Sequence, residues 1–339
     1  MVVNIYKVKK SGVPVSLRSP LDFESVNHHV LICGSSGSGK SYFAKHLFPD
    51  PDGLILFKKD DGLFNGKDII DVSVRGLPDI FNFKVYDVSD AYMYALKINF
   101  SGIMASSIVP VFSQAFLKSL PASRSRVRNS SPFPPARFNL DLFRAENPHS
   151  KLSGFPFFLK VLESNKSHQL ISSVSSLILS HFEVLYPASQ EFRGDSVLNH
   201  SKFSFANIGT FRSEFGAELI LRNYYSSMNK DNGVLMIDEF HHVSRPGSII
   251  DTLLREFRIA GRLVAISQNL SDLSPSMLSN FGYILIGRSI HPDDLLYLSR
   301  IAPELPVLVS SLPKYTFLNL SEYLLNKSDL PLYRWFVED

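Results

Sequence analysis

Gly34-Ser35-Ser36-Gly37-Ser38-Gly39-Lys40-Ser41 is the stretch of this 339-residue chain that decides its fold. It matches the pattern G-x-x-x-x-G-K-[ST] at every required position. The apolar run at 30–33 predicts a buried parallel strand before it, and residues 42–48 predict a helix that ends before Pro49. The backbone N–H groups and the dipole at such a helix start bind anions, and glycines let the backbone close around them. The stretch therefore predicts a site for the phosphates of a nucleotide.

The composition is that of an ordinary folded protein, with 45% hydrophobic and 20% charged residues. A net charge of +3 permits a nucleic-acid partner without requiring one. The single cysteine, Cys33, excludes an internal disulfide and is expected to be a core residue of the first strand. No secretory signal is recognisable, and the uncharged stretch 98–117 is too polar, and too interrupted by Pro110, to span a membrane. We expect a cytoplasmic protein, in the host cytoplasm if it is viral.

A second motif, residues 233–239, is an apolar strand that ends in two acids, Asp238 and Glu239. Ligands of open α/β sheets bind at the carboxyl ends of the strands, so both acids are expected beside the phosphate loop. In that case Lys40 would reach the β- and γ-phosphates of the nucleotide. Ser41 and Asp238 would hold Mg²⁺, and Glu239 would accept a proton from the attacking water.

Further apolar runs alternate with helical patterns, which predicts an α/β fold with a mostly parallel sheet. Gln268 follows one predicted strand and would report the γ-phosphate or orient the water, unless it merely caps that strand. Arg288 follows the next strand. The strands are expected at 54–57, 203–208, 263–267, 283–287 and 315–319, with the last one closing the sheet and a possible additional strand at 83–86; helices are expected at 211–228 and 250–260.

Residues 100–200 are predicted to form a largely helical insertion, with helices at 157–162 and 170–185. The segment 118–137 contains basic residues and prolines but no acid, so it is expected to be a loop. Its Arg124, Arg126 and Arg128 are candidate contacts to DNA phosphates, the alternative being a solvated connector. The expected organisation is a lead-in at 1–29, a core at 30–99 and 201–320, the insertion at 100–200 and a tail at 321–339.

Three stretches of the chain resemble the FtsK/HerA superfamily of DNA-translocating ATPases. They are the histidine-led phosphate loop at 29–41, the Asp-Glu-Phe-His run within 237–241, and the segment 255–288. The last contains an arginine-bearing helix, a glycine, a strand that ends in glutamine and a strand that ends in arginine. Together with its flanking strands, the resemblance covers about residues 29–60 and 203–320.

The resemblance implies a RecA-like P-loop NTPase core that uses ATP and Mg²⁺. It also implies a homo-oligomer, usually a hexameric ring, that moves double-stranded DNA. With 28 residues before the first strand and no membrane anchor, the chain resembles the compact genome-packaging ATPases of viruses or a plasmid-encoded transfer protein. Arg258 or Arg288 is expected to act on the nucleotide of a neighbouring subunit, although either could be an ordinary surface arginine.

Three other interpretations of the sequence remain open. The protein could be an ATP-binding switch or scaffold that moves no DNA, although a pure switch would not need Glu239 and Gln268. Residues 326–329, Asn-Lys-Ser-Asp, match a guanine-specificity pattern, but a GTPase would have D-x-x-G in place of Asp238-Glu239. The adjacent His241 and His242 suggest a metal site, for which the sequence offers no further ligands.

Overall fold

The structure is a computed structural model that describes part of the chain. The described residues fall into two compact units. Unit 1 comprises Met1–Asp71, Ser196–Ile208 and Tyr224–Asp339, and unit 2 comprises Val72–Asp195 and Gly209–Asn223. The described residues are 3–8, 14–16, 28–48, 51–57, 69–71, 85–99, 106, 108–112, 172–178, 202–204, 211–227, 233–245, 247–256, 261–325 and 332–337.

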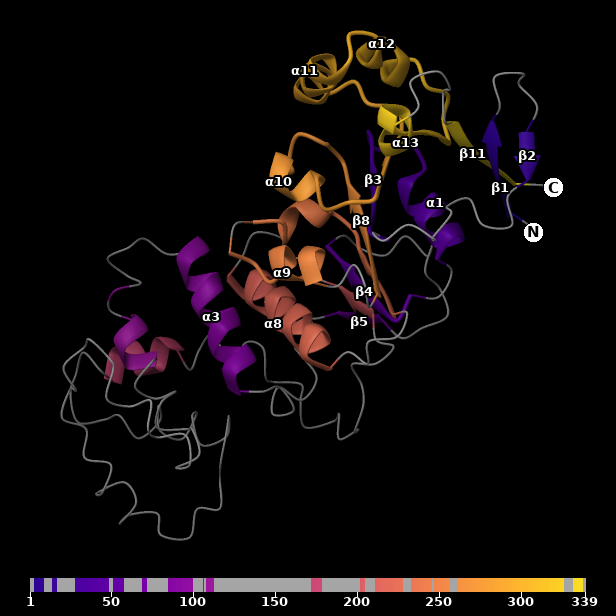
Figure 1. Ribbon diagram of the computed structural model, residues 1–339. Coiled ribbons are helices and arrows are strands. Elements are labelled where there is room, and N and C mark those ends of the chain that lie inside the picture. The colour runs from indigo at the N-terminus through magenta and orange to yellow at the C-terminus, as the bar shows by residue number, and fades with distance from the viewer. Residues whose placement is uncertain are drawn as a thin grey trace. The chain divides into compact units, whose positions relative to one another are not determined.

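The described part of unit 1 is built on one sheet of eleven strands (Figure 1). The strands are β1 (Val3–Val8), β2 (Pro14–Ser16), β3 (Val30–Cys33), β4 (Gly53–Leu56), β5 (Ile69–Asp71), β6 (Lys202–Ser204), β7 (Gly233–Ile237), β8 (Gly261–Ser267), β9 (Tyr283–Ile286), β10 (Thr316–Asn319) and β11 (Leu332–Val337). Their order across the sheet is β2-β1-β11-β10-β9-β3-β8-β7-β4-β6-β5. From β9 to β5 all neighbours are parallel, whereas β10, β11, β1 and β2 continue the sheet in antiparallel pairs.

β3 lies between β8 and β9 and forms the centre of the core. All four of its residues are buried, as expected for a strand that is covered on both faces. α1 (Lys40–Leu47) follows β3, and its Phe43 ring packs against Phe317 of β10, with the ring centroids 4.6 Å apart. At the start of β3, the imidazole Nδ1 of buried His29 accepts a hydrogen bond from the Leu263 N–H at 3.0 Å. His29 thus ties the strand to β8 at the end opposite the phosphate loop.

Most of the predicted strands are confirmed, and two expectations are wrong. Residues 315–319 do not close the sheet, because β10 runs antiparallel to β9 and pairs with β11 on its other side. The possible strand at 83–86 is also wrong, since Val85 begins a helix, α3 (Val85–Asn99). Ala91, Tyr92, Ala95 and Leu96 of that helix are buried at helical spacing, which is a helix-forming pattern.

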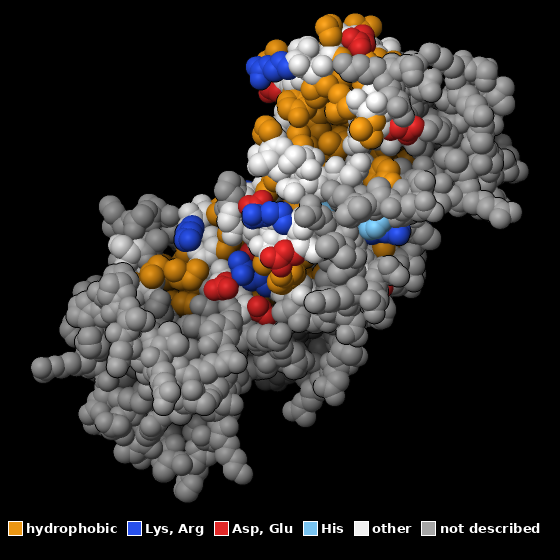
Figure 2. Space-filling model, in the orientation of Figure 1, with side chains coloured by type: hydrophobic (Ala, Val, Ile, Leu, Met, Phe, Trp, Pro, Cys, Tyr) orange, Lys and Arg blue, Asp and Glu red, His pale blue; other side chains and the backbone are white. Residues whose placement is uncertain are grey.

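The other helices of unit 1 follow its strands. They are η3 (Phe240–His242), α9 (Ile250–Glu256), α10 (Pro275–Leu278), α11 (Pro292–Ile301), α12 (Leu305–Ser310) and α13 (Leu320–Leu325). Large hydrophobic side chains are exposed on α11 and α12, where Leu296 is 54% and Val307 72% exposed. Figure 2 shows hydrophobic side chains gathered over this part of unit 1. Exposed apolar patches of this kind are typical of contact surfaces.

The described part of unit 2 is helical. It consists of α3, residues 108–112 and 172–178, and the first part of α8 (Phe211–Ser227). The Tyr92 ring stacks on Phe112 at 4.3 Å and meets Phe215 edge-on at 5.8 Å, so three segments share one apolar centre. The expected helix at 157–162 and the basic segment lie outside the described residues, as do the ends of the expected helix at 170–185. Among the helices that can be described, none is long and apolar enough to cross a membrane.

Candidate nucleotide-binding site

The loop between β3 and α1 has the backbone of an anion cradle. Three of its glycines have positive φ angles: 145° at Gly34, 78° at Gly37 and 96° at Gly39. Gly39 is the N-cap of α1, so the helix begins directly at Lys40. A Cβ on Gly34 would lie 3.1 Å from the Gly287 carbonyl carbon and 3.2 Å from the Arg288 carbonyl oxygen. Only glycine therefore fits this close approach without a shift of the backbone.

The loop is tied to the ends of both neighbouring strands. The Gly34 N–H donates to the Gln268 carbonyl at 3.3 Å, just beyond β8. The backbone N–H and the hydroxyl of Ser35 both donate to the Arg288 carbonyl at 2.8 Å, beyond β9. On the far side the Tyr315 N–H, in a residue with φ of 64°, donates to the Ser38 carbonyl at 3.2 Å. These contacts hold the cradle in shape.

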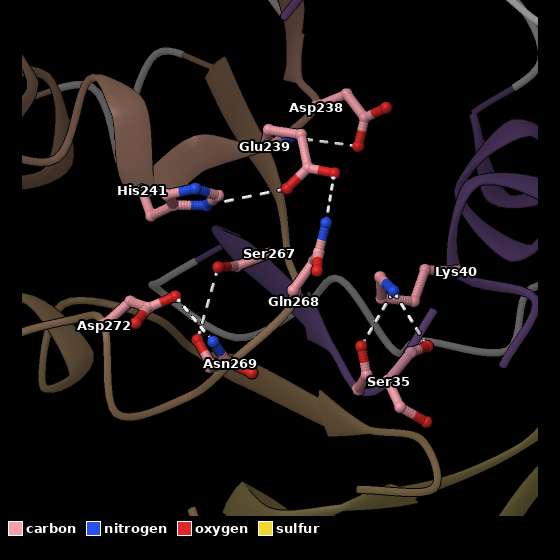
Figure 3. Close-up of polar contacts among 10 residues, drawn as sticks. Ser35, Lys40, Asp238, Glu239, His241, Ser267, Gln268, Asn269 and Asp272 are labelled. Carbon is pink, nitrogen blue, oxygen red and sulfur yellow. Dashed lines mark hydrogen bonds and ion pairs between the residues drawn. The ribbon is translucent and has the colours of Figure 1, made fainter. Parts of the chain in front are cut away.

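Lys40 lies over the loop that precedes it (Figure 3). Its Nζ donates to the carbonyl of Gly34 at 2.7 Å and to that of Ser35 at 3.1 Å. The ammonium group is thus held at the phosphate loop, where it is available to pair with an anion. Ser41, in the first turn of α1, is partly buried.

The two acids follow β7, as the sequence predicts. The Asp238 N–H donates to the Ile55 carbonyl at 2.9 Å, and the Asp238 carboxylate accepts a hydrogen bond from the Glu239 N–H at 3.0 Å. Glu239 is only 4% exposed and has a left-handed backbone, with φ of 51° and ψ of 50°. A left-handed non-glycine residue is strained, and such residues cluster at functional sites.

Gln268 connects the acids with the phosphate loop. Its side-chain Nε2 donates to the Glu239 carboxylate at 2.8 Å, while its backbone carbonyl accepts the Gly34 N–H. On its other side the Glu239 carboxylate lies 3.6 Å from Nδ1 of His241, whose ring packs on His242 with centroids 4.0 Å apart. Figure 3 shows Glu239 between these two side chains. The hydrogen bond from Gln268 therefore orients the carboxylate, and His241 lies beside its other oxygen.

The residues at this edge of the sheet fit a magnesium–nucleotide complex. Mg²⁺ prefers oxygen ligands and in nucleotide sites is held by one or two protein groups together with the phosphates. The Ser41 hydroxyl and the Asp238 carboxylate supply such oxygens. Within the described residues no group of three or more His, Cys, Asp or Glu side chains could hold a metal ion without a substrate. Among the described residues, His241 and His242 belong to no such group.

Four adjacent strands of the sheet, β9, β3, β8 and β7, therefore bring together the phosphate loop, Gln268, Asp238, Glu239 and the backbone of Arg288. The side chain of Arg288 is exposed. Arg258 lies outside the described residues, and so do Arg124, Arg126 and Arg128 and the Asn-Lys-Ser-Asp stretch at 326–329.

Two further residues near the phosphate loop, Cys33 and Asp294, are buried. Burial, reinforced by the negative charge of Asp294, raises the pKa of the Cys33 thiol, which keeps it neutral and suits a core role. Asp294 itself, in the first turn of α11, is buried and bonded to the loops beyond β8 and β9. Sequence reasoning missed it, because Pro292 and the two following acids signal only the start of a helix.

Fold and site together define an α/β P-loop NTPase fold. No family model and no curated protein matches this sequence. Solved structures do match in fold. VirB4 of Thermoanaerobacter pseudethanolicus superposes with a TM-score of 0.59 at 14% identity, over 93% of each chain. The plasmid coupling protein TrwB in complex with ADP and Mg²⁺ gives 0.52 at 17% identity, over 93% of this chain and 85% of that one.

The predicted resemblance is thus confirmed at the level of the fold. The genome-packaging NTPase B204 from Sulfolobus turreted icosahedral virus 2 gives a TM-score of only 0.39 at 13% identity, over 93% of this chain and 100% of that one.

Proposed function

We propose that the protein is an ATP-hydrolysing motor of the FtsK/HerA superfamily that translocates double-stranded DNA. The observation that carries the proposal is the double contact of Gln268, which bonds Glu239 through its side chain and the phosphate loop through its carbonyl. A site built for nucleotide binding alone would not need a buried carboxylate tied to the phosphate loop. The fold shared with VirB4 and TrwB supports the same assignment.

In this proposal Glu239 is the general base. It accepts a proton from the water that attacks the γ-phosphorus, the bond between that phosphorus and the β–γ bridging oxygen breaks, and ADP and inorganic phosphate leave. The amide of Gln268 holds the carboxylate in place and would respond to a γ-phosphate bound at the adjacent phosphate loop. Buried carboxylates are effective bases only when they are oriented toward the water, and the contact at 2.8 Å supplies that orientation.

The remaining residues of the site bind the nucleotide. The N–H groups of the loop 34–39 and the start of α1 would hold the phosphates, and the ammonium of Lys40 would move from the loop carbonyls to the β- and γ-phosphates. Ser41 and Asp238 would hold Mg²⁺, which when bound neutralises charge on the phosphates. TrwB is solved with ADP and Mg²⁺, with an ATP analogue and with a GTP analogue, which supports a magnesium–nucleotide complex here. We propose ATP as that nucleotide.

We propose that the motor works as a homo-oligomer, most simply a hexameric ring. An arginine suits the transition-state charge of phosphoryl transfer because its planar fork matches the phosphate oxygens. The exposed side chain of Arg288, at the rim of the site, is one candidate to act on a neighbour's nucleotide, and Arg258 is the other. The exposed hydrophobic side chains of α11 and α12 support burial against another subunit.

Double-stranded DNA is the proposed substrate of the motor. TrwB is a bacterial conjugative coupling protein, and the shared fold supports DNA transfer in this chain. Viral genome packaging is the other role that the resemblance to the superfamily implies. Arg124, Arg126 and Arg128 would contact the DNA phosphates without reading sequence. Either role places the protein in a cytoplasm, that of the host if the source is a virus.

The competing function is an ATP-binding switch or scaffold. Turnover of ATP with and without double-stranded DNA, together with a sizing measurement, separates the two. We expect steady-state hydrolysis that DNA stimulates severalfold and an oligomer that forms with nucleotide. A protein that binds ATP tightly but turns it over at the same negligible rate with and without DNA would be the switch, and the proposal would be rejected.

A further inference from the structure

Asp294 is a buried acid whose two carboxylate oxygens bond two different loops. It lies in the first turn of α11 and is 2% exposed. Oδ1 accepts the Ser271 N–H at 2.9 Å, and Oδ2 accepts the Ser289 hydroxyl at 2.9 Å. A buried carboxylate is costly unless hydrogen bonds compensate for lost water, and here both oxygens are compensated.

Both partners of Asp294 follow residues of the candidate site. Ser271 lies three positions after Gln268, and Ser289 directly follows Arg288. The backbone carbonyls of Gln268 and Arg288 are the same groups that accept hydrogen bonds from Gly34 and Ser35. The Asp294 carboxylate therefore connects the loops after β8 and β9, and these two loops hold the phosphate loop through their backbone carbonyls. We call this connection the Asp294 brace.

A simpler role, that of a helix cap, does not account for these contacts. An acid in the first turn commonly favours a helix through the dipole, and in a capping box it accepts the N–H of the N-cap residue. The N-cap here is His291, and its N–H lies 3.4 Å from the Ser289 hydroxyl instead. The neighbouring Asp293 is exposed and already supplies an acid to this turn. Asp294 bonds outward, to the site loops.

We propose that Asp294 is a positioning residue of the hydrolytic site. It keeps the loops 268–274 and 287–291 in one fixed arrangement, so that the Gln268 amide meets the γ-phosphate of its own site while the exposed Arg288 side chain is held at the rim, facing a neighbouring subunit. This inference rests on the proposed function of the site. Phosphate-loop contacts made by Lys40 and the N–H groups of α1 do not pass through Asp294, so hydrolysis should depend on it more than nucleotide affinity does.

The test compares Asp294→Asn with Asp293→Asn, the same chemical change one residue away on the exposed side. In Asp294→Asn the amide oxygen can still accept the Ser271 N–H and the NH₂ group can donate to the Ser289 hydroxyl, so two charge-assisted hydrogen bonds become weaker neutral ones. We expect kcat to fall about tenfold, while KM and ADP affinity stay within about twofold. Asp293→Asn should leave all three values unchanged.

Ser289→Ala is a second variant that avoids removing buried charge. It deletes the hydroxyl that donates to Oδ2 of Asp294 and accepts the His291 N–H, keeps the charge of Asp294, and should lower kcat in the same direction. If the two changes remove one interaction, the double variant Asp294→Asn/Ser289→Ala should be no slower than the slower single variant. If the double variant instead loses the product of the two single losses in kcat, the two groups act separately. That result would contradict the proposed contact between Asp294 and Ser289 as the source of the effect.

Amide hydrogen exchange of the nucleotide-free protein gives a readout independent of hydrolysis. We expect faster exchange in both segments 268–274 and 287–291 of Asp294→Asn, and no change in Asp293→Asn. Three results for Asp294→Asn would show that Asp294 is a purely structural residue. They are unchanged hydrogen exchange, exchange that rises evenly over the whole chain, and an ADP affinity that falls as much as kcat. If the parent protein shows no turnover, the proposed function fails while the exchange data still decide whether the Asp294 brace exists.

Discussion

The side-chain amide of Gln268 donates a hydrogen bond of 2.8 Å to the buried carboxylate of Glu239. The two residues end adjacent parallel strands, β8 and β7, so the contact crosses from one strand end to the next. Because the carbonyl of Gln268 also accepts the Gly34 N–H, one residue touches both the candidate base and the phosphate loop. Binding or release of phosphate at the loop can therefore shift the Glu239 carboxylate through one residue, Gln268.

Removing the charge of Glu239 should separate binding from hydrolysis. Glu239→Gln keeps the size of the side chain and an oxygen that can accept from Gln268, but it cannot take a proton from water. We expect ATP affinity within about threefold of the parent and hydrolysis lower by about 10²-fold or more, the contribution of a general base. Lys40→Ala should weaken both, which makes it the control. Unchanged turnover in Glu239→Gln would remove this residue from the chemistry.

Two glycines of the phosphate loop should respond differently to alanine. At Gly37 a Cβ meets no atom within 4 Å, so Gly37→Ala costs only the strain of a positive φ, about 1–2 kcal/mol. At Gly34 the same Cβ meets the Gly287 and Arg288 backbone at 3.1–3.2 Å. We expect Gly34→Ala to lower the free energy of unfolding further in urea titrations and to abolish ADP binding. Equal effects of the two variants would show that the loop lacks this tight contact.

Arg288 should act on the nucleotide of a neighbouring subunit. Arg288→Ala and Lys40→Ala should each be nearly inactive alone, because one lacks the charge donated across the interface and the other lacks nucleotide contacts. A mixture should recover part of the activity, since some interfaces then contain both intact groups. The assemblies must first be shown to exchange subunits. If the activity of the mixture then equals the sum of the two variants at every ratio, Arg288 does not act across the interface, and Arg258 is tested in the same way.

The basic segment should set the salt dependence of DNA binding. Each phosphate that a protein neutralises contributes about −0.9 to the slope of log K against log salt. Replacing Arg124, Arg126 and Arg128 by serine should flatten that slope by about one to three units and weaken binding alike for all sequences. ATP affinity without DNA serves as the control and should not change. An identical slope in variant and parent would show that the segment does not contact the DNA backbone.

The strands that carry the site were predictable because each is a short apolar run followed directly by a glycine or a polar residue. The runs at 30–33 and 263–267 and the last three residues of 233–237 are buried, as in strands that are covered on both faces. The strand expected at 83–86 was wrong because a run of four residues does not distinguish a strand from the first turn of a helix. Its helical spacing becomes evident only further along α3.

Long-range pairing was not predictable from local pattern. β1 pairs with β11, bringing Val3 opposite Val337, and no local feature of either segment indicates its partner. β10 pairs antiparallel with both β9 and β11, a direction that its own residues do not indicate. Likewise Asp294 follows a helix-start signal that an exposed acid would satisfy equally well. Its burial and its two partners arise only when the loops beyond β8 and β9 meet.

Displacement of a third strand from a DNA triplex tests most directly the claim that this protein is a DNA motor. A translocating ring strips the third strand from the duplex, which a fluorescence change reports, without needing a specific sequence. We expect displacement with ATP and Mg²⁺, and none with a non-hydrolysable analogue or with Glu239→Gln. ATP hydrolysis by the parent protein, with triplex displacement no greater than that of Glu239→Gln, would contradict the account.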